Sequence, residues 1–248
     1  MKLRFLGSGD AFGSGGRFNT CFLVDASGMR FLIDCGASSM IAMRKFDVDP
    51  NSIDAVLITH LHGDHFGGLV FMLMDAQLVS KRDRPLRIVG PKTLAKRLSD
   101  TMECLFPGST GMTWRYEVTI DSFEDGLPWH HDGLAVTPFR VKHFCGAPPY
   151  AVRAEIGGKT VTYTGDTEWV DALVPAGRDA DLFIAEAYYR DKQMKFHLNF
   201  ETLMSHLDEI RPKRLVLTHM SDDMLASPPA LPTGIAVDVA EDGLELTV

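Results

Sequence analysis

The segment THLHGDHFGG, residues 59–68, holds the densest group of chemically active side chains in this sequence. His60, His62, Asp64 and His65 place three imidazoles and one carboxylate within six residues. Alternate residues of an extending strand point the same way, so the first two histidines can bind one ion. The following turn carries Asp64 and the third histidine toward a neighbouring position. Imidazole with carboxylate is a ligand set for zinc and, with more oxygen, for manganese or iron, so the motif predicts a metal site.

Further residues of ligand type follow apolar strands elsewhere in the chain. VLITH ends in His60, VTYTGD in Asp166 and RLVLTH in His219, while FRVKH, which lacks the threonine, ends in His143. Ligands at the carboxyl ends of several strands converge on one edge of a sheet, as sites in α/β architectures commonly do. One motif of four ligands cannot complete two ions, so we expect the remaining ligands at these strand ends.

The elements that must position these residues are short strands interspersed with helices. Apolar runs, several with a period close to two, predict strands over residues 3–7, 21–26, 30–36, 54–60, 86–90, 114–120, 134–143, 150–156, 159–166, 181–187, 214–220 and 243–248. Helical patterns cover residues 37–46, 66–79, 91–102 and 199–210. No proline- or serine-rich linker divides the chain, so we expect one domain over residues 1–248, of α/β class, with two sheets covered by helices.

Composition narrows the classes of partner and compartment. The chain has 248 residues, is 45% hydrophobic and carries a net charge of −8, which argues against a long nucleic acid as partner. The basic runs KRDRPLR (81–87) and RPKR (211–214) are expected to be a solvated loop and a helix-to-strand turn.

The four cysteines are scattered without CxxC spacing, so a disulfide framework is not expected. The first residues, MKLRFLGSGDAFGSGG, make a poor signal peptide, and no stretch approaches membrane-spanning length. These features favour a reducing, cytoplasmic setting.

THLHGDH, a strand-end histidine, TGDT and LTHM, in this order, resemble the metallo-β-lactamase-fold hydrolases. The resemblance covers nearly the whole chain, from GSGDAFGSGG and FLIDCG through LTHM, and implies a four-layer αββα sandwich with two metal ions at one edge. Carried over residue by residue, the family's ligands are His60, His62 and His143 for the first metal, Asp64, His65 and His219 for the second, and Asp166 for both. Asp34, in IDCG, matches a carboxylate that supports the ligand loop.

Within that superfamily the sequence is most similar to the phosphodiesterase branch, which comprises ribonuclease Z and its PhnP-like relatives. In that branch a further histidine follows the strand after the bridging aspartate, and a glutamate supports it; Glu186 and His197 match these places. A lone histidine ahead of a helix, as in KFHLNF, is by itself typical of a surface or packing residue. The resemblance implies instead that His197 is the general acid for a leaving alkoxide, while a hydroxide bridging the two metals attacks phosphorus.

The substrate class is bounded by the spacing of the ligands. Ribonuclease Z enzymes usually bind tRNA with a long arm between the third metal-binding histidine and the bridging aspartate. Here His143 and Asp166 are 23 positions apart, with two strands and a tight GGK turn between them. Together with the negative charge, this favours a small or cyclic nucleotide phosphodiester over tRNA 3′-processing.

Two other functions use the same fold. A thioester or lactone hydrolase of the glyoxalase II kind has the same ligands, but the acidic, strand-like sequence after His219 differs from the basic helical region of the glutathione enzymes. A non-enzymatic metal-binding protein is disfavoured by the complete ligand set.

Several expectations concern the surroundings of the site. Zinc is the first choice of metal, with manganese or iron as alternatives, and the resemblance implies a homodimer. Tyr150 is a candidate substrate contact or, equally, a packing residue at the start of a strand, and Cys21 and Cys145 are candidates for the pocket lining. The remaining histidines, His130, His131 and His206, are expected in a loop between strands and on a helix surface.

Overall fold

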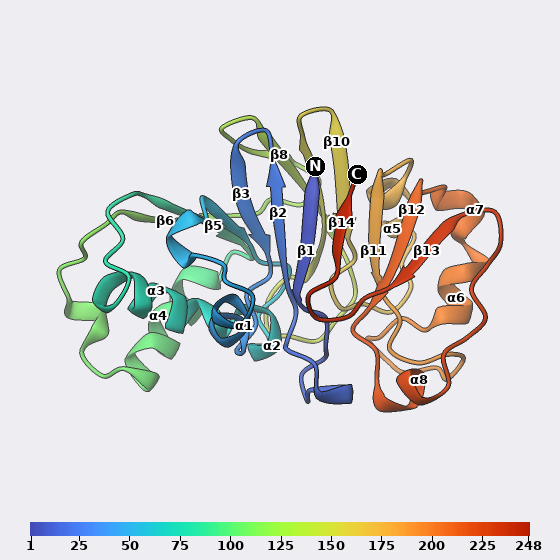
Figure 1. The fold of residues 1–248 in the computed structure, drawn as a ribbon, viewed down its shortest axis with the longest axis horizontal. Helices are drawn as coiled ribbons and strands as arrows, with labels where there is room; N and C mark the ends of the chain where they lie inside the picture. Colours follow the sequence, from blue (N-terminus) through green and yellow to red (C-terminus); the bar gives the residue numbers. More distant parts are fainter.

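The computed structural model describes residues 1–248, in which the strands form two seven-stranded sheets packed face to face (Figure 1). The first sheet has the order β14 (Glu245–Thr247), β1 (Lys2–Gly7), β2 (Cys21–Ala26), β3 (Met29–Ile33), β4 (Ala55–Leu57), β5 (Leu86–Gly90) and β6 (Val118–Ser122). The second has the order β13 (Ala236–Val239), β12 (Arg214–Thr218), β11 (Leu182–Glu186), β10 (Lys159–Tyr163), β9 (Tyr150–Ile156), β8 (Leu134–Arg140) and β7 (Trp129–His131). Each sheet is antiparallel on one side, from β14 to β3 and from β7 to β10, and parallel on the other.

Alternation along the strands divides the side chains between three cores. In β11, Leu182 and Ile184 point into the core between the sheets, whereas Phe183 and Ala185 point into an outer core beneath helices. Successive side chains of a strand face opposite sides, so a strand with both faces covered must be apolar throughout. This explains why LFIAE and RLVLT are almost continuous apolar runs.

Helices cover the outer face of each sheet, which completes the predicted αββα sandwich. The first sheet carries α1 (Ser39–Lys45), α2 (Gly63–Phe66), α3 (Gly68–Leu78) and α4 (Leu94–Leu105). The second carries α5 (Leu173–Gly177), α6 (Phe200–Ser205), α7 (Leu207–Ile210) and α8 (Asp222–Ala226). In α4 the buried residues Leu94, Leu98 and Met102 recur every four residues, the spacing that places them on one helix face. None of the helices combines the length and apolar character required to cross a membrane.

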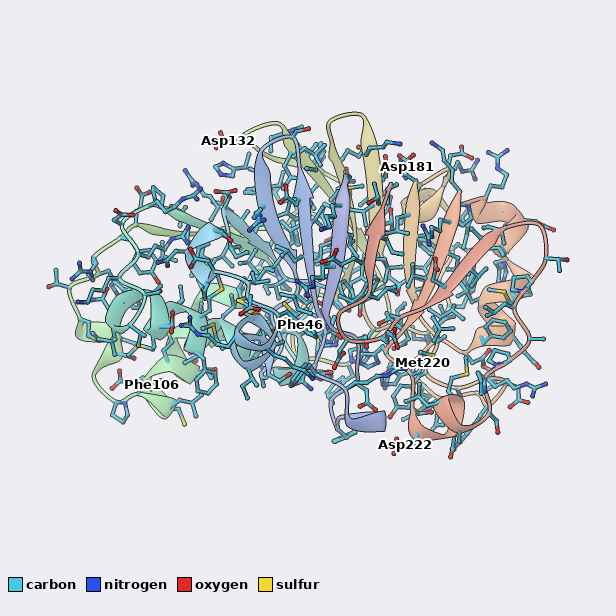
Figure 2. The ribbon with its side chains drawn as sticks, viewed as in Figure 1. Phe46, Phe106, Asp132, Asp181, Met220 and Asp222 are labelled. Carbon is cyan, nitrogen blue, oxygen red and sulfur yellow. The ribbon has the colours of Figure 1, made fainter.

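Short 3-10 turns occur at Ser14–Gly16, Pro50–Ser52 and Ser109–Gly111. The first of these turns lies beside α8, where Figure 2 labels Asp222. The Gly15 amide donates a 2.8 Å hydrogen bond to Asp222 Oδ1. The N-terminal loop is therefore attached to the second half of the chain.

Some predicted boundaries are wrong. Residues 129–131 form β7 rather than a loop, because Trp129 to His131 pair antiparallel with β8. The predicted helix over 199–210 is two helices, α6 and α7, that meet at His206, whose ring stacks on Trp169 at a centroid distance of 3.7 Å. β6 begins at Val118 rather than at residue 114.

The basic run 81–87 is not a uniformly solvated loop, because Arg82 is buried. Its guanidinium donates to the carbonyl oxygens of Asn51 (3.2 Å), Ile53 (2.8 Å), Arg84 (2.8 Å) and Pro85 (2.6 Å). Five donors in a fixed fork suit several carbonyls at once. Arg82 thus joins the turn before β4 to the turn before β5.

We expect Arg82→Met to lower the free energy of unfolding by about 3 kcal/mol, because buried carbonyls lose their donors at roughly 1–3 kcal/mol each. Urea denaturation at unchanged m-value measures this loss. Arg84→Met is the matched control, since Arg84 is half-exposed and its ion pair with Asp54 contributes about 1 kcal/mol or less. Equal midpoints for the two variants would contradict the assigned role.

Candidate metal centre

The predicted ligands all lie just beyond strand ends. After β4 the chain carries His60 and His62, and α2 then carries Asp64 and His65. The other three, His143, Asp166 and His219, follow β8, β10 and β12 respectively. Strands from both sheets therefore deliver side chains to one place, as the sequence predicts.

Two main-chain hydrogen bonds join the two sheets at this place. The Tyr150 amide donates to the Thr59 carbonyl at 3.0 Å, beside His60, and the His219 amide donates to the Ser8 carbonyl at 3.1 Å. His219 itself adopts a left-handed conformation with φ 56°. Backbone fixed on both sides of the site holds the side chains in register across the sheet junction.

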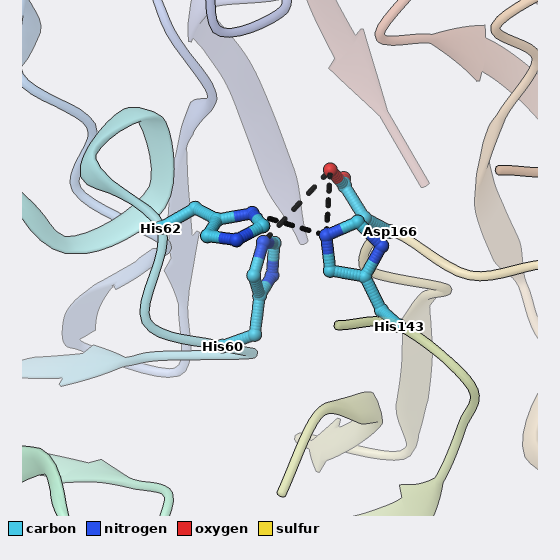
Figure 3. Close-up of side chains that lie close together, drawn as sticks. All are labelled: His60, His62, His143 and Asp166. Carbon is cyan, nitrogen blue, oxygen red and sulfur yellow. Dashed lines mark hydrogen bonds and ion pairs between the residues drawn. The ribbon is translucent and has the colours of Figure 1, made fainter. Parts of the chain in front are cut away.

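The first group of converging side chains comprises three histidines and one aspartate, shown in Figure 3. One candidate donor atom from each of His60, His62, His143 and Asp166 lies within 4.8 Å of the others. Asp166 Oδ2 is 3.8 Å from His60 Nε2 and 3.9 Å from His143 Nε2. These two distances are too long for hydrogen bonds and leave room for a cation beside Asp166, whereas His143 Nε2 and His62 Nδ1 lie 3.0 Å apart, at hydrogen-bonding distance.

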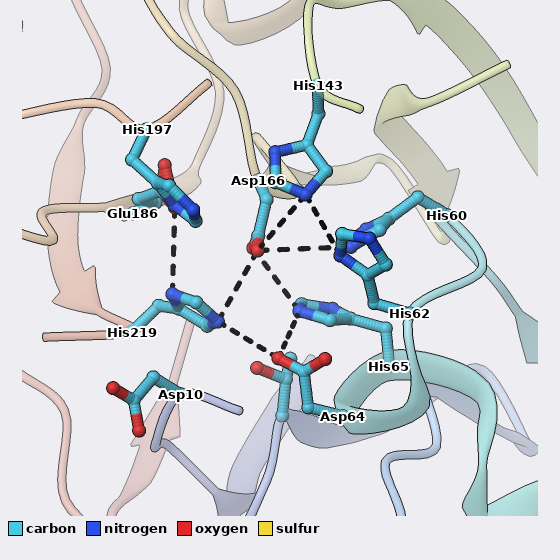
Figure 4. A network of polar contacts seen from close by, with 12 residues as sticks. Asp10, His60, His62, Asp64, His65, His143, Asp166, Glu186, His197 and His219 are labelled. Atoms are coloured by element: carbon cyan, nitrogen blue, oxygen red, sulfur yellow. Dashed lines mark hydrogen bonds and ion pairs between the residues drawn. The ribbon is translucent and has the colours of Figure 1, made fainter. Parts of the chain in front are cut away.

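The second group shares Asp166 with the first (Figure 4). Its members are Asp64, His65, Asp166 and His219, all buried. Asp64 Oδ2 is 3.2 Å from His65 Nε2 and 3.3 Å from His219 Nε2. Asp166 Oδ1 is 3.2 Å from His65 Nε2, and its Oδ2 is 3.5 Å from His219 Nε2.

Buried polar atoms without hydrogen-bond partners indicate that these residues fit divalent ions. His60 Nε2, His65 Nε2 and Asp166 Oδ1, which lie within the two groups, are buried without a hydrogen-bond partner. Buried polar atoms are almost always bonded, so several orphans facing one point require an explanation. A cation bound by imidazole nitrogens and carboxylate oxygens supplies it.

His60 and His143 are held in the neutral form that metal binding requires. Burial lowers the pKa of His60 well below its usual value and that of His143 to about 4, which keeps both imidazoles neutral with a lone pair free. Burial also opposes the charge on His219, but Asp166 nearby raises its pKa to about 9. A bound ion would displace that proton, because only neutral imidazole is a ligand.

Asp34 lies behind the ligands. Its Oδ2 is 2.7 Å from His65 Nδ1, and its two oxygens accept from the Thr59 amide and hydroxyl, each at 2.8 Å. A carboxylate on the second nitrogen of a ligating histidine fixes the ring and its tautomer. Gly36 follows in the same IDCG segment, where a Cβ would come within 2.1 Å of the Asp64 carbonyl. Only glycine allows the α2 turn to approach so closely.

His197 and Glu186 form a pair beside the two groups. His197 Nδ1 is 2.9 Å from Glu186 Oε2, and the fully buried Glu186 also accepts through Oε1 from the Leu198 amide at 2.8 Å. Although burial opposes charge on His197, the adjacent carboxylate raises its pKa. The ring of Tyr188 stacks on His197 at 4.7 Å between centroids. The imidazole is thus positioned by Glu186 at Nδ1 and by Tyr188 on one face of the ring.

A cavity of about 160 Å³ opens onto these residues. Its lining is Asp10, Ala11, Phe12, His62, Asp64, Asp166, Tyr188, Met194, His197 and His219. Sequence reasoning missed Asp10, Phe12 and Tyr188. The GSGD loop was visible as a glycine-rich segment, but its approach to the site depends on packing against Asp222, far along the chain.

The candidate substrate contact at Tyr150 does not reach the cavity. Its side chain is 1% exposed in the core between the sheets, and its hydroxyl donates to Asp125 at 2.5 Å. The buried position argues against substrate binding there. Neither Cys21 nor Cys145 belongs to the cavity lining.

The fold and the two groups of ligand-type side chains define the class of protein, a metallo-β-lactamase-fold hydrolase. The human tRNase Z, short form, matches 100% of this chain and 99% of its own at 26% identity with a TM-score of 0.79. A diphosphatase from the PhnP family matches 100% and 97% at 21% identity with a TM-score of 0.77. Ribonuclease Z of Archaeoglobus fulgidus is 24% identical over 89% of this chain and 87% of its own.

The family is more specific than the class. The family model described as Anti-Pycsar protein Apyc1 matches residues 1–232, and the chain belongs to this family. These comparisons confirm the predicted superfamily, its ribonuclease Z-like and PhnP-like branch, and the enzyme class: the chain is a metal-dependent phosphodiester hydrolase.

Proposed function

We propose that this enzyme cleaves a small or cyclic nucleotide phosphodiester, with His197 as the general acid. The observation that carries the proposal is that His197, hydrogen-bonded to the buried Glu186, lines the same cavity as four of the ligand-type residues, His62, Asp64, Asp166 and His219. Metal-dependent hydrolysis alone needs only those groups. A proton donor beside them suits a substrate whose leaving oxygen is a poor leaving group.

In this proposal His60, His62 and His143 would hold one divalent ion, Asp64, His65 and His219 would hold another, and Asp166 would be available to both. Zinc is the first expectation, with manganese or iron as alternatives. When bound, such ions lower the pKa of water to supply the nucleophile and neutralise phosphate oxygens.

The chain's own residues perform the remaining tasks. Glu186 occupies Nδ1 of His197, which leaves Nε2 to donate a proton to the leaving oxygen in the cavity. Burial raises the pKa of Glu186, and the Leu198 amide holds its other oxygen in place. General acid catalysis of this kind contributes about 10²–10⁴ in rate.

A small substrate is favoured over tRNA for two reasons. The cavity of about 160 Å³ is smaller than sites of roughly 300–1,000 Å³ that enclose drug-sized ligands. The segment between His143 and Asp166 consists of β9, β10 and the turn at Gly157 and Gly158, together with the short loops that flank them, so it contains no long arm for binding tRNA.

The family description names an anti-Pycsar protein, and we propose that phosphodiester hydrolysis is how this chain carries out such a role.

Hydrolysis assays after loading with zinc, manganese or iron test the function. We expect turnover of cyclic 2′,3′- or 3′,5′-nucleotides and of bis(p-nitrophenyl) phosphate, and little turnover of S-lactoylglutathione or a homoserine lactone. An enzyme that hydrolyses the thioester or the lactone but no diester would sink the proposal and restore the glyoxalase II alternative.

The assembly and domain organisation are also proposals. We propose that residues 1–248 act as one domain and that two copies pair as a homodimer. Light scattering coupled to size-exclusion chromatography measures the mass directly, and a monomer at micromolar concentration would contradict the pairing.

A further inference from the structure

Two apolar side chains stand at the mouth of the cavity. Phe12 is 89% exposed and Met194 is 42% exposed, and both belong to its lining. Exposed apolar residues scattered singly are ordinary on a protein surface. These two come from distant segments and border the same opening, whereas the other lining residues, apart from Ala11 and Tyr188, are histidines and aspartates. The mouth and the floor therefore differ in the chemistry they offer.

Hydrogen bonds to the buried Asp10 hold the loop that carries Phe12 in place. Asp10, which is 1% exposed, accepts from the Phe12 amide at 3.2 Å and the Ser14 amide at 2.9 Å through Oδ1, and from the Ser14 hydroxyl at 2.7 Å through Oδ2. Figure 4 shows Asp10 beside His219 and Asp64. The Asn19 side-chain amide donates to the Asp10 carbonyl at 2.9 Å. Phe12 is thus presented to solvent by an ordered turn, which limits the entropy lost when it binds a ligand.

The size of the cavity determines what remains outside. A space of about 160 Å³ suits a phosphodiester and part of a sugar, but not a whole nucleotide. If the phosphate occupies the polar floor, the base must lie at the mouth, next to Phe12 and Met194. Aromatic side chains stack on any base because every base has a π-face.

We propose that Phe12, supported by Met194, binds the base of the substrate by stacking at the mouth of the cavity. This inference rests on the proposed nucleotide phosphodiesterase function and adds a base-binding subsite to it. Phe12 does not take part in the reaction. It therefore contributes binding that is equal in the ground state and the transition state, which affects KM and leaves kcat unchanged.

The test compares a cyclic nucleotide with a base-free sugar cyclic phosphate of the same ring. For Phe12→Ala we expect KM for the nucleotide to rise about tenfold, equivalent to about 1.4 kcal/mol, at unchanged kcat. The base-free diester should be hydrolysed with the same KM by the variant and the wild type. Phe12→Trp should restore the wild-type KM for the nucleotide, because indole also stacks.

Leu127→Ala is the control, since Leu127 is an exposed apolar residue (58%) outside the cavity lining, and it should change neither KM. An unchanged nucleotide KM in Phe12→Ala, or equal changes for both diesters, would overturn the stacking subsite while leaving the phosphodiesterase function intact. Failure of the wild-type enzyme to hydrolyse either diester would overturn both proposals.

Discussion

Asp166→Asn is expected to lower the bound metal from two ions per chain to one or none. Asp166 is the one residue shared by the two groups of ligand-type side chains, with oxygens 3.2–3.9 Å from imidazole nitrogens on both sides. The amide retains the shape of the side chain but removes the negative charge that offsets two cations. Inductively coupled plasma spectrometry on the desalted protein counts the ions.

Thermal unfolding provides a second measurement that does not depend on activity. Free ion at about 100 times its dissociation constant stabilises the folded state by about 2.7 kcal/mol per site. For a chain of this size that raises Tm by roughly 5–10 °C. The wild type should show such a rise over the chelator-treated protein, and Asp166→Asn should lose most of it.

Asp132→Asn is the matched control for this variant. Asp132 is an exposed carboxylate with φ 44°, a conformation that asparagine also adopts readily. It should bind two ions and keep the full metal-dependent rise in Tm. Two ions bound by Asp166→Asn at wild-type affinity would refute the shared-ligand assignment.

The convergence of the seven ligand-type side chains could be predicted because their signal is local. His60, Asp166 and His219 each come shortly after an apolar strand. The carboxyl ends of parallel strands meet at one edge of a sheet, so these side chains lie close together. The alternation in YAVRAEI likewise predicts the direction in which the side chain of Tyr150 points. Tyr150, Val152, Ala154 and Ile156 share one strand face, and that face is buried between the sheets.

The residues that escaped prediction depend on contacts between distant segments. Phe12 and Asp10 reach the cavity because the N-terminal loop is attached to α8 through Gly15 and Asp222, a pairing that no periodicity reveals. The strand β7 was not predicted, although a local signal for it was present in the sequence. The Asp132–Gly133 pair, with φ 44° and 83°, is a typical two-residue hairpin turn and was a usable signal for the strand before it.

His197→Ala should separate proton donation from metal binding. For a diester with an alkoxide leaving group, such as a cyclic nucleotide, we expect kcat to fall about 10²–10⁴-fold, the usual contribution of a general acid. For bis(p-nitrophenyl) phosphate the loss should be much smaller, because p-nitrophenolate departs without a proton. Glu186→Gln should have an intermediate effect, since it leaves the imidazole in place but removes the charge that supports it.

His206→Ala is the control, because that imidazole stacks on Trp169 away from the cavity and should not alter either rate. Metal content decides between the two roles open to His197. Donor atoms of His197, Asp166, Glu186 and His219 lie within 4.8 Å of one another, so this third group could itself hold an ion. A ligand role predicts loss of an ion in His197→Ala and equal losses for both leaving groups. A general acid predicts full metal content and a loss that grows with the basicity of the leaving oxygen.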